Sequence, residues 1–220
     1  MPLTDDLRRA NQELWERMVT HPFPQELGDG TLPREKFRRY FLQDYAFVGP
    51  LIKLVALGVA KAPDLSSARP LAAFLQGFFA GGEEGLFQRV FQDLGVPPEE
   101  YLRVRPLPTT QAFNAYLTAV AYDGSFADIL TCLLVTEGAY VDWSRRLART
   151  GRIPSDSFYR EWIDIHASEE LKGFVDWVAG WLDRAALSPG QRARVEEVFT
   201  AVLRYEFAFW EMAYHGEAWG

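Results

Sequence analysis

Three acidic residues lie within apolar stripes of helical periodicity, and their side chains are the best placed in this chain to do chemistry. Asp44, Glu137 and Glu206 each share a helix face with aromatic and aliphatic residues at i, i+3, i+4 and i+7 spacing. A carboxylate on a buried face costs free energy unless it has a partner or a function. Such groups can bind a polar ligand through charged hydrogen bonds or transfer protons.

The residues alone leave two interpretations of these acids open. Each acid could be structural and bonded to an Arg, Tyr or Trp, because ion-pair networks also bury carboxylates. Alternatively, if the three helices pack into one bundle, the acids meet in an aromatic-lined interior. Bundle cores are a recurrent place for ligand and catalytic sites. The presence of an acid on three separate stripes favours the second interpretation.

The composition indicates a soluble protein with a large core. The chain has 220 residues, 48% hydrophobic and 15% aromatic, with a net charge of -7 at pH 7. The acidic balance and the scattered Lys and Arg residues argue against nucleic-acid binding. A single cysteine, Cys132, excludes an intrachain disulfide and suits a cytoplasmic location. No signal peptide is recognisable, and Pro50 and Lys53 interrupt the longest apolar stretch, so no membrane is expected as a partner.

Helical periodicity predicts an all-α fold, in which residues 1–220 form a single-domain helical bundle. We expect Thr4 to cap the first helix, His21-Pro22-Phe23 to break it, and the paired glycines 81 and 82 to mark a helix irregularity. Ser188, Pro189 and Gln191 form a start signal for the last helix. The expected helices span approximately residues 4–20, 33–61, 67–94, 109–122, 126–149, 156–165, 169 onward, and 189–216.

Several runs of residues, taken in order, resemble the TenA (thiaminase II) family. They are HPF at 21–23, YFLQDY at 40–45, GSFADIL at 124–130 and YEFAFWEMAY at 205–214. The resemblance covers nearly the whole chain. It implies an all-helical fold like that of haem oxygenase, assembly as a homotetramer, and hydrolysis of aminopyrimidines in thiamin salvage.

The resemblance also implies roles for particular residues. Asp44 matches the acid that binds the amino group and ring nitrogen of the pyrimidine, and Glu206 matches a catalytic acid. The positions that match ring-stacking aromatic residues are Phe47, Phe113 and Tyr140. His166 falls where many members have a tyrosine and is expected to contact the substrate as well.

One departure from the family pattern concerns the nucleophile. Many members carry a cysteine four residues before the tyrosine matched by Tyr140, and here that position is Thr136. Glu137 follows, which resembles the branch of the family in which a glutamate replaces the thiol. Thiol-dependent cleavage of thiamin itself is therefore not expected. Cys132 is not expected to replace the missing nucleophile, because nearby acids and apolar neighbours raise the pKa of a thiol and keep it protonated. It is expected to be a small buried residue instead.

The combined expectation is a hydrolase acting on aminomethyl- or N-formylaminomethyl-pyrimidines. One of Glu137 and Glu206 would activate water, and the other would protonate the leaving amine. The sequence leaves open which glutamate has which role. No cofactor and no metal are expected, since the Glu-x-x-His pattern of di-iron bundles is absent from the sequence. Two alternatives remain: a di-iron oxidase on a haem-oxygenase-like scaffold, and a non-catalytic pyrimidine- or thiamin-binding protein.

Overall fold

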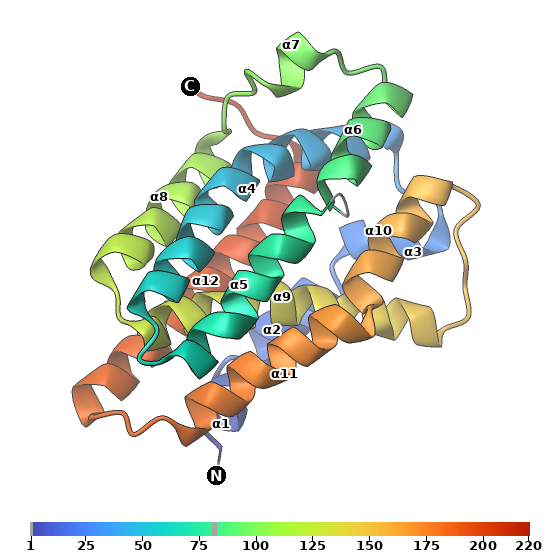
Figure 1. The fold of residues 1–220 in the computed structure, drawn as a ribbon. Helices are drawn as coiled ribbons and strands as arrows, with labels where there is room; N and C mark the ends of the chain where they lie inside the picture. The colour runs from blue at the N-terminus through green and yellow to red at the C-terminus, as the bar shows by residue number, and fades with distance from the viewer. Residues whose placement is uncertain (1, 81–82) are drawn as a thin grey trace. The chain divides into compact units, whose positions relative to one another are not determined.

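The structure is a computed structural model that describes residues 2–80 and 83–220, and within these residues the regular secondary structure is entirely helical (Figure 1). The all-α prediction is therefore confirmed. The helices are α1 (Leu3–Ala10), α2 (Gln12–Val19), α3 (Pro22–Asp29), α4 (Arg34–Lys61), α5 (Leu65–Phe79), α6 (Glu83–Asp93), α7 (Pro98–Tyr101), α8 (Pro108–Asp123), α9 (Phe126–Arg149), α10 (Ser157–Ala167), α11 (Glu169–Arg184) and α12 (Pro189–His215).

The chain forms two compact units, and each is built from two separate segments. The first unit comprises Met1–Thr31 and Ala127–Ala208, and the second comprises Leu32–Phe126 and Phe209–Gly220. In the first unit α1 packs against α2 and α11, and α10 packs against α3 and α11. Local hydrogen bonds start two of its helices. The Ser168 hydroxyl accepts from the Leu171 N–H at α11. Ser188 and Gln191 cap each other reciprocally at α12, as their spacing predicted.

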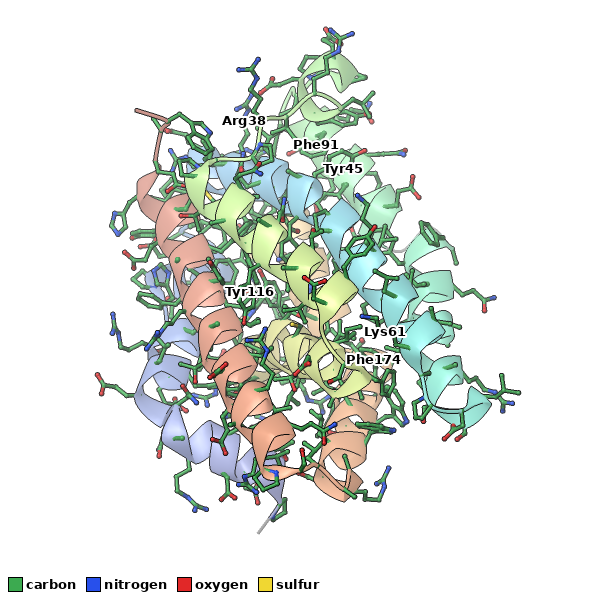
Figure 2. All side chains as sticks on the ribbon, turned by 90° about the vertical axis from the view of Figure 1, so that its left-hand side faces the viewer. Arg38, Tyr45, Lys61, Phe91, Tyr116 and Phe174 are labelled. Carbon is green, nitrogen blue, oxygen red and sulfur yellow. The ribbon has the colours of Figure 1, made fainter. Side chains whose placement is uncertain are left out.

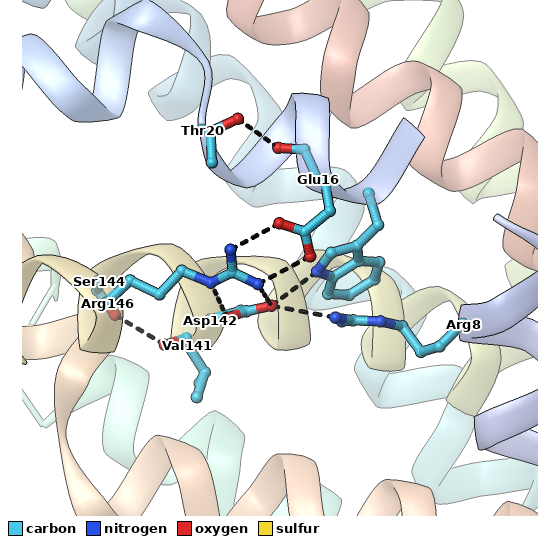
Figure 3. A network of polar contacts seen from close by, with 8 residues as sticks. Arg8, Glu16, Thr20, Val141, Asp142, Ser144 and Arg146 are labelled. Atoms are coloured by element: carbon cyan, nitrogen blue, oxygen red, sulfur yellow. Dashed lines mark hydrogen bonds and ion pairs between the residues drawn. The ribbon is translucent and has the colours of Figure 1, made fainter. Parts of the chain in front are cut away.

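A charged network joins α1, α2 and α9 in the first unit (Figure 3). The Asp142 carboxylate accepts hydrogen bonds from the Arg8 guanidinium at 3.1 Å and from the Trp15 indole at 2.8 Å. Arg146 donates to Asp142 at 2.7 Å and makes two further bonds to Glu16, at 2.7 and 3.0 Å. The Arg8 guanidinium also lies 3.4 Å from the centroid of the Trp15 ring. This network ties α9, which carries several candidate residues, to the two N-terminal helices.

In the second unit α4 packs against α5, α6 and α8 (Figure 1). Helices α4 and α8 run in the same direction, as two contacts show: Gln43, in the first half of α4, binds the start of α8, and Lys61, the last residue of α4, binds its end. The Gln43 amide oxygen accepts from the Leu107 N–H at 2.8 Å, just before α8. Lys61, labelled at the end of α4 in Figure 2, donates to the carbonyls of Tyr122 and Gly124 at 2.7 Å each.

Aromatic side chains fill the interior of the second unit. Tyr40 on α4 stacks on Trp210 of α12 with ring centroids 5.2 Å apart. Tyr45, one turn further along α4, packs edge-on against Phe91 of α6 at 5.6 Å (Figure 2). Such pairs contribute roughly 0.5–1.5 kcal/mol beyond the area that they bury. They hold in place the part of α4 that carries Asp44.

The N-terminal part of the chain differs from the prediction in three respects. The single helix expected over residues 4–20 is two helices, which meet at Asn11. Thr4 lies inside α1 instead of capping it, because its N–H and hydroxyl both donate to Asp183 of α11. The expected break at His21 is confirmed, since α2 ends at Val19, but an additional helix, α3, starts there, and the His21 Nδ1 caps it by accepting from the Phe23 N–H.

The helix expected over residues 67–94 is also two helices, α5 and α6, in the described residues. The paired glycines predicted to mark an irregularity, Gly81 and Gly82, lie outside the described residues. The helices expected over 33–61, 109–122, 126–149 and 189–216 are confirmed to within a residue or two as α4, α8, α9 and α12.

One of the described helices, α4, is long and apolar enough to cross a membrane by length and composition alone. An 18-residue window within it has a mean hydropathy of 1.3, and 44% of that window is buried. This qualifies the sequence-based argument that Pro50 and Lys53 interrupt the longest apolar stretch. It is weak evidence for a membrane span, because the core helices of globular proteins pass the same test.

Candidate active site

Glu137 lies on α9 beside Thr136, whose hydroxyl donates to the Glu137 carboxylate at 3.2 Å. Part of the residue remains exposed, although protein atoms surround its carboxyl group. Burial raises the pKa of Glu137 to about 7, against the smaller opposing effect of the Thr136 hydrogen bond. At neutral pH both protonation states are therefore populated. A carboxyl group with this pKa can donate or accept a proton in a reaction.

Glu206 lies on the part of α12 that belongs to the first unit, and only 4% of its surface is exposed. The residues preceding it on the same helix face are fully buried: Val195, Val198, Phe199 and Val202. The predicted apolar stripe around Glu206 is thus confirmed. A carboxyl group in such surroundings is held away from bulk water. Its interactions with other charges are therefore stronger than they would be in water.

His166 on α10 is held in one tautomer. Its Nδ1 lies 2.8 Å from the carbonyl oxygen of Trp162, and because a carbonyl only accepts, Nδ1 carries the proton. Burial lowers the pKa of His166 to about 4, so the ring is neutral at pH 7 and Nε2 is a hydrogen-bond acceptor. The Tyr140 ring of α9 lies 4.9 Å from the His166 ring. These two candidate residues are therefore brought together.

The second unit holds Asp44, Phe47 and Phe113. Asp44 and Phe47 lie on successive turns of α4 and are each 8% exposed, so both are buried as predicted. The Phe47 ring lies 4.9 Å from the Phe113 ring of α8. Phe209 of α12 also approaches Phe47, at 6.1 Å, and sequence reasoning did not include it among the candidates. Phe209 lies three residues after Glu206, at the spacing of one helix face, but periodicity does not show which aromatic rings touch.

Cys132 is fully buried on α9. Burial, and next the negative charge of Asp128, raise the pKa of its thiol far above the usual range. The thiol stays protonated at any physiological pH and is a poor nucleophile. The predicted burial of Cys132 is confirmed.

The described residues contain no group of three or more His, Cys, Asp or Glu side chains placed to hold a metal ion. His215 and Glu211, which share a helix face, form a pair near the end of α12 with Nε2 3.7 Å from the carboxylate.

The helical architecture defines the class of protein, which is the haem oxygenase-like fold. Haem oxygenase 2 from Chlamydomonas reinhardtii is similar to this chain with a TM-score of 0.64, covering 96% of this chain and 97% of the other at 16% identity. At that identity the similarity concerns the fold alone. The sequence matches the TENA/THI-4/PQQC family over residues 8–216. The chain belongs to this family.

Relatives of known name extend over the full length. An aminopyrimidine aminohydrolase from Halalkalibacterium halodurans is 33% identical, over 100% of this chain and 98% of its own length. Another, from Helicobacter pylori, is 29% identical over 97% of this chain and 99% of its own length. Among solved structures, a TenA homologue from P. horikoshii OT3 has a TM-score of 0.89 at 28% identity, covering 99% of this chain and 100% of the other.

Proposed function

We propose that this chain is an aminopyrimidine hydrolase of thiamin salvage, acting on pyrimidines that carry an aminomethyl or N-formylaminomethyl group. The observation that carries the proposal is the full-length similarity, at 33% identity, to an aminopyrimidine aminohydrolase. In the reaction the bond between the methylene carbon of the substrate and its nitrogen breaks. A C–O bond forms at the same carbon, and water supplies the oxygen. A base takes a proton from the water, and an acid gives a proton to the leaving amine.

In this proposal Asp44 binds the pyrimidine ring. Its carboxylate accepts hydrogen bonds from the amino group and from the protonated ring nitrogen, an arrangement stronger than neutral hydrogen bonds. Phe47, Phe113 and Tyr140 supply aromatic faces for stacking on the ring. The burial of Asp44 and the contact between Phe47 and Phe113 support these assignments.

Glu137 and Glu206 transfer the protons. The pKa of Glu137, raised to about 7 by burial, suits either role at neutral pH, and the hydroxyl of Thr136 orients its carboxyl group. His166, as a neutral acceptor, is suited to receive a hydrogen bond from an N–H or O–H group of the substrate. Thiamin itself is a poor substrate in this proposal, because Thr136 replaces the nucleophilic cysteine and the Cys132 thiol stays protonated.

A steady-state assay of the wild-type chain tests the proposal. We expect release of ammonia from an aminomethylpyrimidine, or of formamide from its N-formyl derivative, with thiamin cleaved at least a hundredfold more slowly, about the lower limit of one acid or base contribution. Rapid cleavage of thiamin would contradict the thiol-free mechanism. Binding of pyrimidines without turnover would point to the non-catalytic alternative.

We also propose that the chain is a cytoplasmic homotetramer that binds neither nucleic acid nor membranes. The net charge of -7 supports the first exclusion, and the single buried cysteine suits a reducing compartment. The tetramer rests on the family resemblance. Light scattering should give the mass of four chains at micromolar concentration, and a monomer would contradict this part of the proposal.

A further inference from the structure

Pro50 leaves a gap in the hydrogen bonds of α4. The helix continues from Arg34 to Lys61 with Pro50 in its interior. In an α-helix the N–H of each residue bonds the carbonyl four residues earlier, and proline has no N–H. The carbonyl of Ala46 therefore lacks the donor that it would normally have, the N–H of residue 50. Ala46 is only partly exposed, and a carbonyl that is shielded from water costs free energy when it has no donor, so a replacement is expected from elsewhere.

Asn114 of α8 supplies that replacement. Its side-chain Nδ2 donates to the Ala46 carbonyl at 3.1 Å, and the residue is only 9% exposed. The other amide atom, Oδ1, is buried and has no hydrogen-bond partner among the described residues. An amide that leaves its own oxygen unsatisfied gains little from burial except through the bond that it makes. The bond to Ala46 therefore accounts for a buried asparagine between Phe113 and Leu117.

The position of this bond connects it to the candidate residues. Ala46 lies directly before Phe47 and two residues after Asp44, on the turn whose bonding Pro50 interrupts. Asn114 lies directly after Phe113, whose ring contacts that of Phe47 at 4.9 Å. This hydrogen bond thus links the segment of α4 with two candidate residues directly to the segment of α8 with a third.

We propose that Asn114 is a positioning residue, which replaces the hydrogen bond removed by Pro50 and so holds Asp44 and Phe47 in the orientation that binds a pyrimidine. The affinity part of this inference rests on the proposed function. Gln43 and Lys61 bind the two ends of α8 independently, so loss of the Asn114 amide leaves the packing of α8 on α4 in place.

Four variants test the inference: Asn114→Ala, Pro50→Ala, the double variant, and the control Gln111→Ala, which removes an exposed amide from the same helix. Asn114→Ala should raise KM and the calorimetric Kd for an aminomethylpyrimidine roughly three- to tenfold, the equivalent of one hydrogen bond, with kcat nearly unchanged. Pro50→Ala returns a donor to the Ala46 carbonyl. In the Pro50→Ala background, Asn114→Ala should therefore raise KM less than about twofold. The control Gln111→Ala, made in the wild type, should leave KM and Kd unchanged.

Urea unfolding of the same variants separates this inference from the proposed function, because it needs no substrate. We expect Asn114→Ala to lower the urea concentration at the unfolding midpoint, and the double variant to recover most of that decrease. The double variant also keeps the test available if Asn114→Ala alone does not fold. Independent effects of the two substitutions on the midpoint would overturn the inference, as would an unchanged KM in Asn114→Ala. The wild type could bind no pyrimidine while the effects of Asn114→Ala and Pro50→Ala on the urea midpoint still depend on each other. In that case the proposed function fails, and the replacement of the Pro50 hydrogen bond by Asn114 stands.

Discussion

At the residue scale, Glu137 combines a cost in stability with a capacity for proton transfer. Its surroundings raise its pKa to about 7, whereas a glutamate in water titrates near ~4.3. Maintaining such a group in the ionised form is unfavourable to folding. Natural proteins keep residues of this kind mainly where their chemistry is used. The pKa therefore supports a catalytic role for Glu137 more than a structural one.

The first prediction concerns the pH dependence of stability. Because the folded pKa of Glu137 is raised, the folded state retains a proton that the unfolded state loses between about pH 4.3 and pH 7. Stability from this group is thus greatest at low pH and falls as the pH rises through that window. Glu137→Gln removes the effect. We expect the variant to gain roughly 1–3 kcal/mol over the wild type between pH 5 and pH 8, measured by urea unfolding. An equal pH dependence of both proteins would contradict the assigned pKa.

The second prediction concerns the ring anchor. Asp44→Asn should weaken the binding of an aminomethylpyrimidine by roughly 2–5 kcal/mol, because a buried charged hydrogen-bond partner is lost. Isothermal calorimetry measures the change, and circular dichroism checks that the helices remain. The matched control is Asp123→Asn, at the exposed end of α8, which should bind as the wild type does. Unchanged affinity in Asp44→Asn would remove this residue from the site.

At the element scale, α9 depends on the network around Asp142. Burial opposes ionisation of this carboxyl group, but hydrogen bonds from Arg146, Trp15 and Arg8 outweigh it and lower the pKa of Asp142. A group with a lowered pKa stabilises the fold above its unfolded pKa, about 3.9 for aspartate, and loses that contribution as the pH falls further. The network therefore stabilises the attachment of α9 at neutral pH and weakens in acid.

The third prediction follows from this network. Asp142→Asn should lower the free energy of unfolding at pH 7 by roughly 1–3 kcal/mol, since two arginines lose a charged partner. The difference from the wild type should shrink at pH 3. The control Asp176→Asn removes one partner of an exposed i, i+4 pair with Lys172 and should cost less than about 0.5 kcal/mol. Equal effects of the two substitutions would show that the network around Asp142 is not special.

The sequence predicts the long helices well and the short ones poorly. Helices α4, α9 and α12 have sustained apolar stripes, and α12 also has a capping signal, so local residues determine their bounds. The division at Asn11 and the existence of α3 depend on tertiary contacts and on the unusual cap by His21. Such features do not follow from periodicity.

The candidate residues show the same division. Resemblance and periodicity identified Asp44 and Glu206, and both are buried. The tautomer of His166 depends on a carbonyl distance that no sequence pattern encodes. The role of Asn114 had a signal, since Pro50 requires a donor for the carbonyl of Ala46, but sequence does not show which helix supplies it.

At the scale of the whole molecule, neither compact unit is a continuous piece of chain. Each unit combines two segments, and α9 and α12 contribute residues to both. The family match over residues 8–216 includes both units. We therefore expect the chain to behave as one domain, in keeping with the single-domain helical bundle predicted over residues 1–220.

The fourth prediction tests this expectation. Differential scanning calorimetry of the full chain should show a single unfolding transition. Its calorimetric enthalpy should equal its van't Hoff enthalpy, as expected for all-or-none unfolding. Fluorescence and far-UV circular dichroism should report the same midpoint. Two separated transitions would show that the units unfold independently and would contradict the single-domain expectation.

The central claim is that carboxylates, and no thiol, perform hydrolysis in this protein. The most direct test is kcat/KM for an aminomethylpyrimidine in Glu206→Gln, Glu137→Gln, their double variant and the control Cys132→Ser. We predict that each glutamine variant loses roughly 10²–10⁴-fold and that the double variant is little worse, because an acid and a base in one reaction act as a unit. Cys132→Ser should retain most activity. Near-wild-type turnover in Glu137→Gln, or inactivation by Cys132→Ser, would contradict the claim.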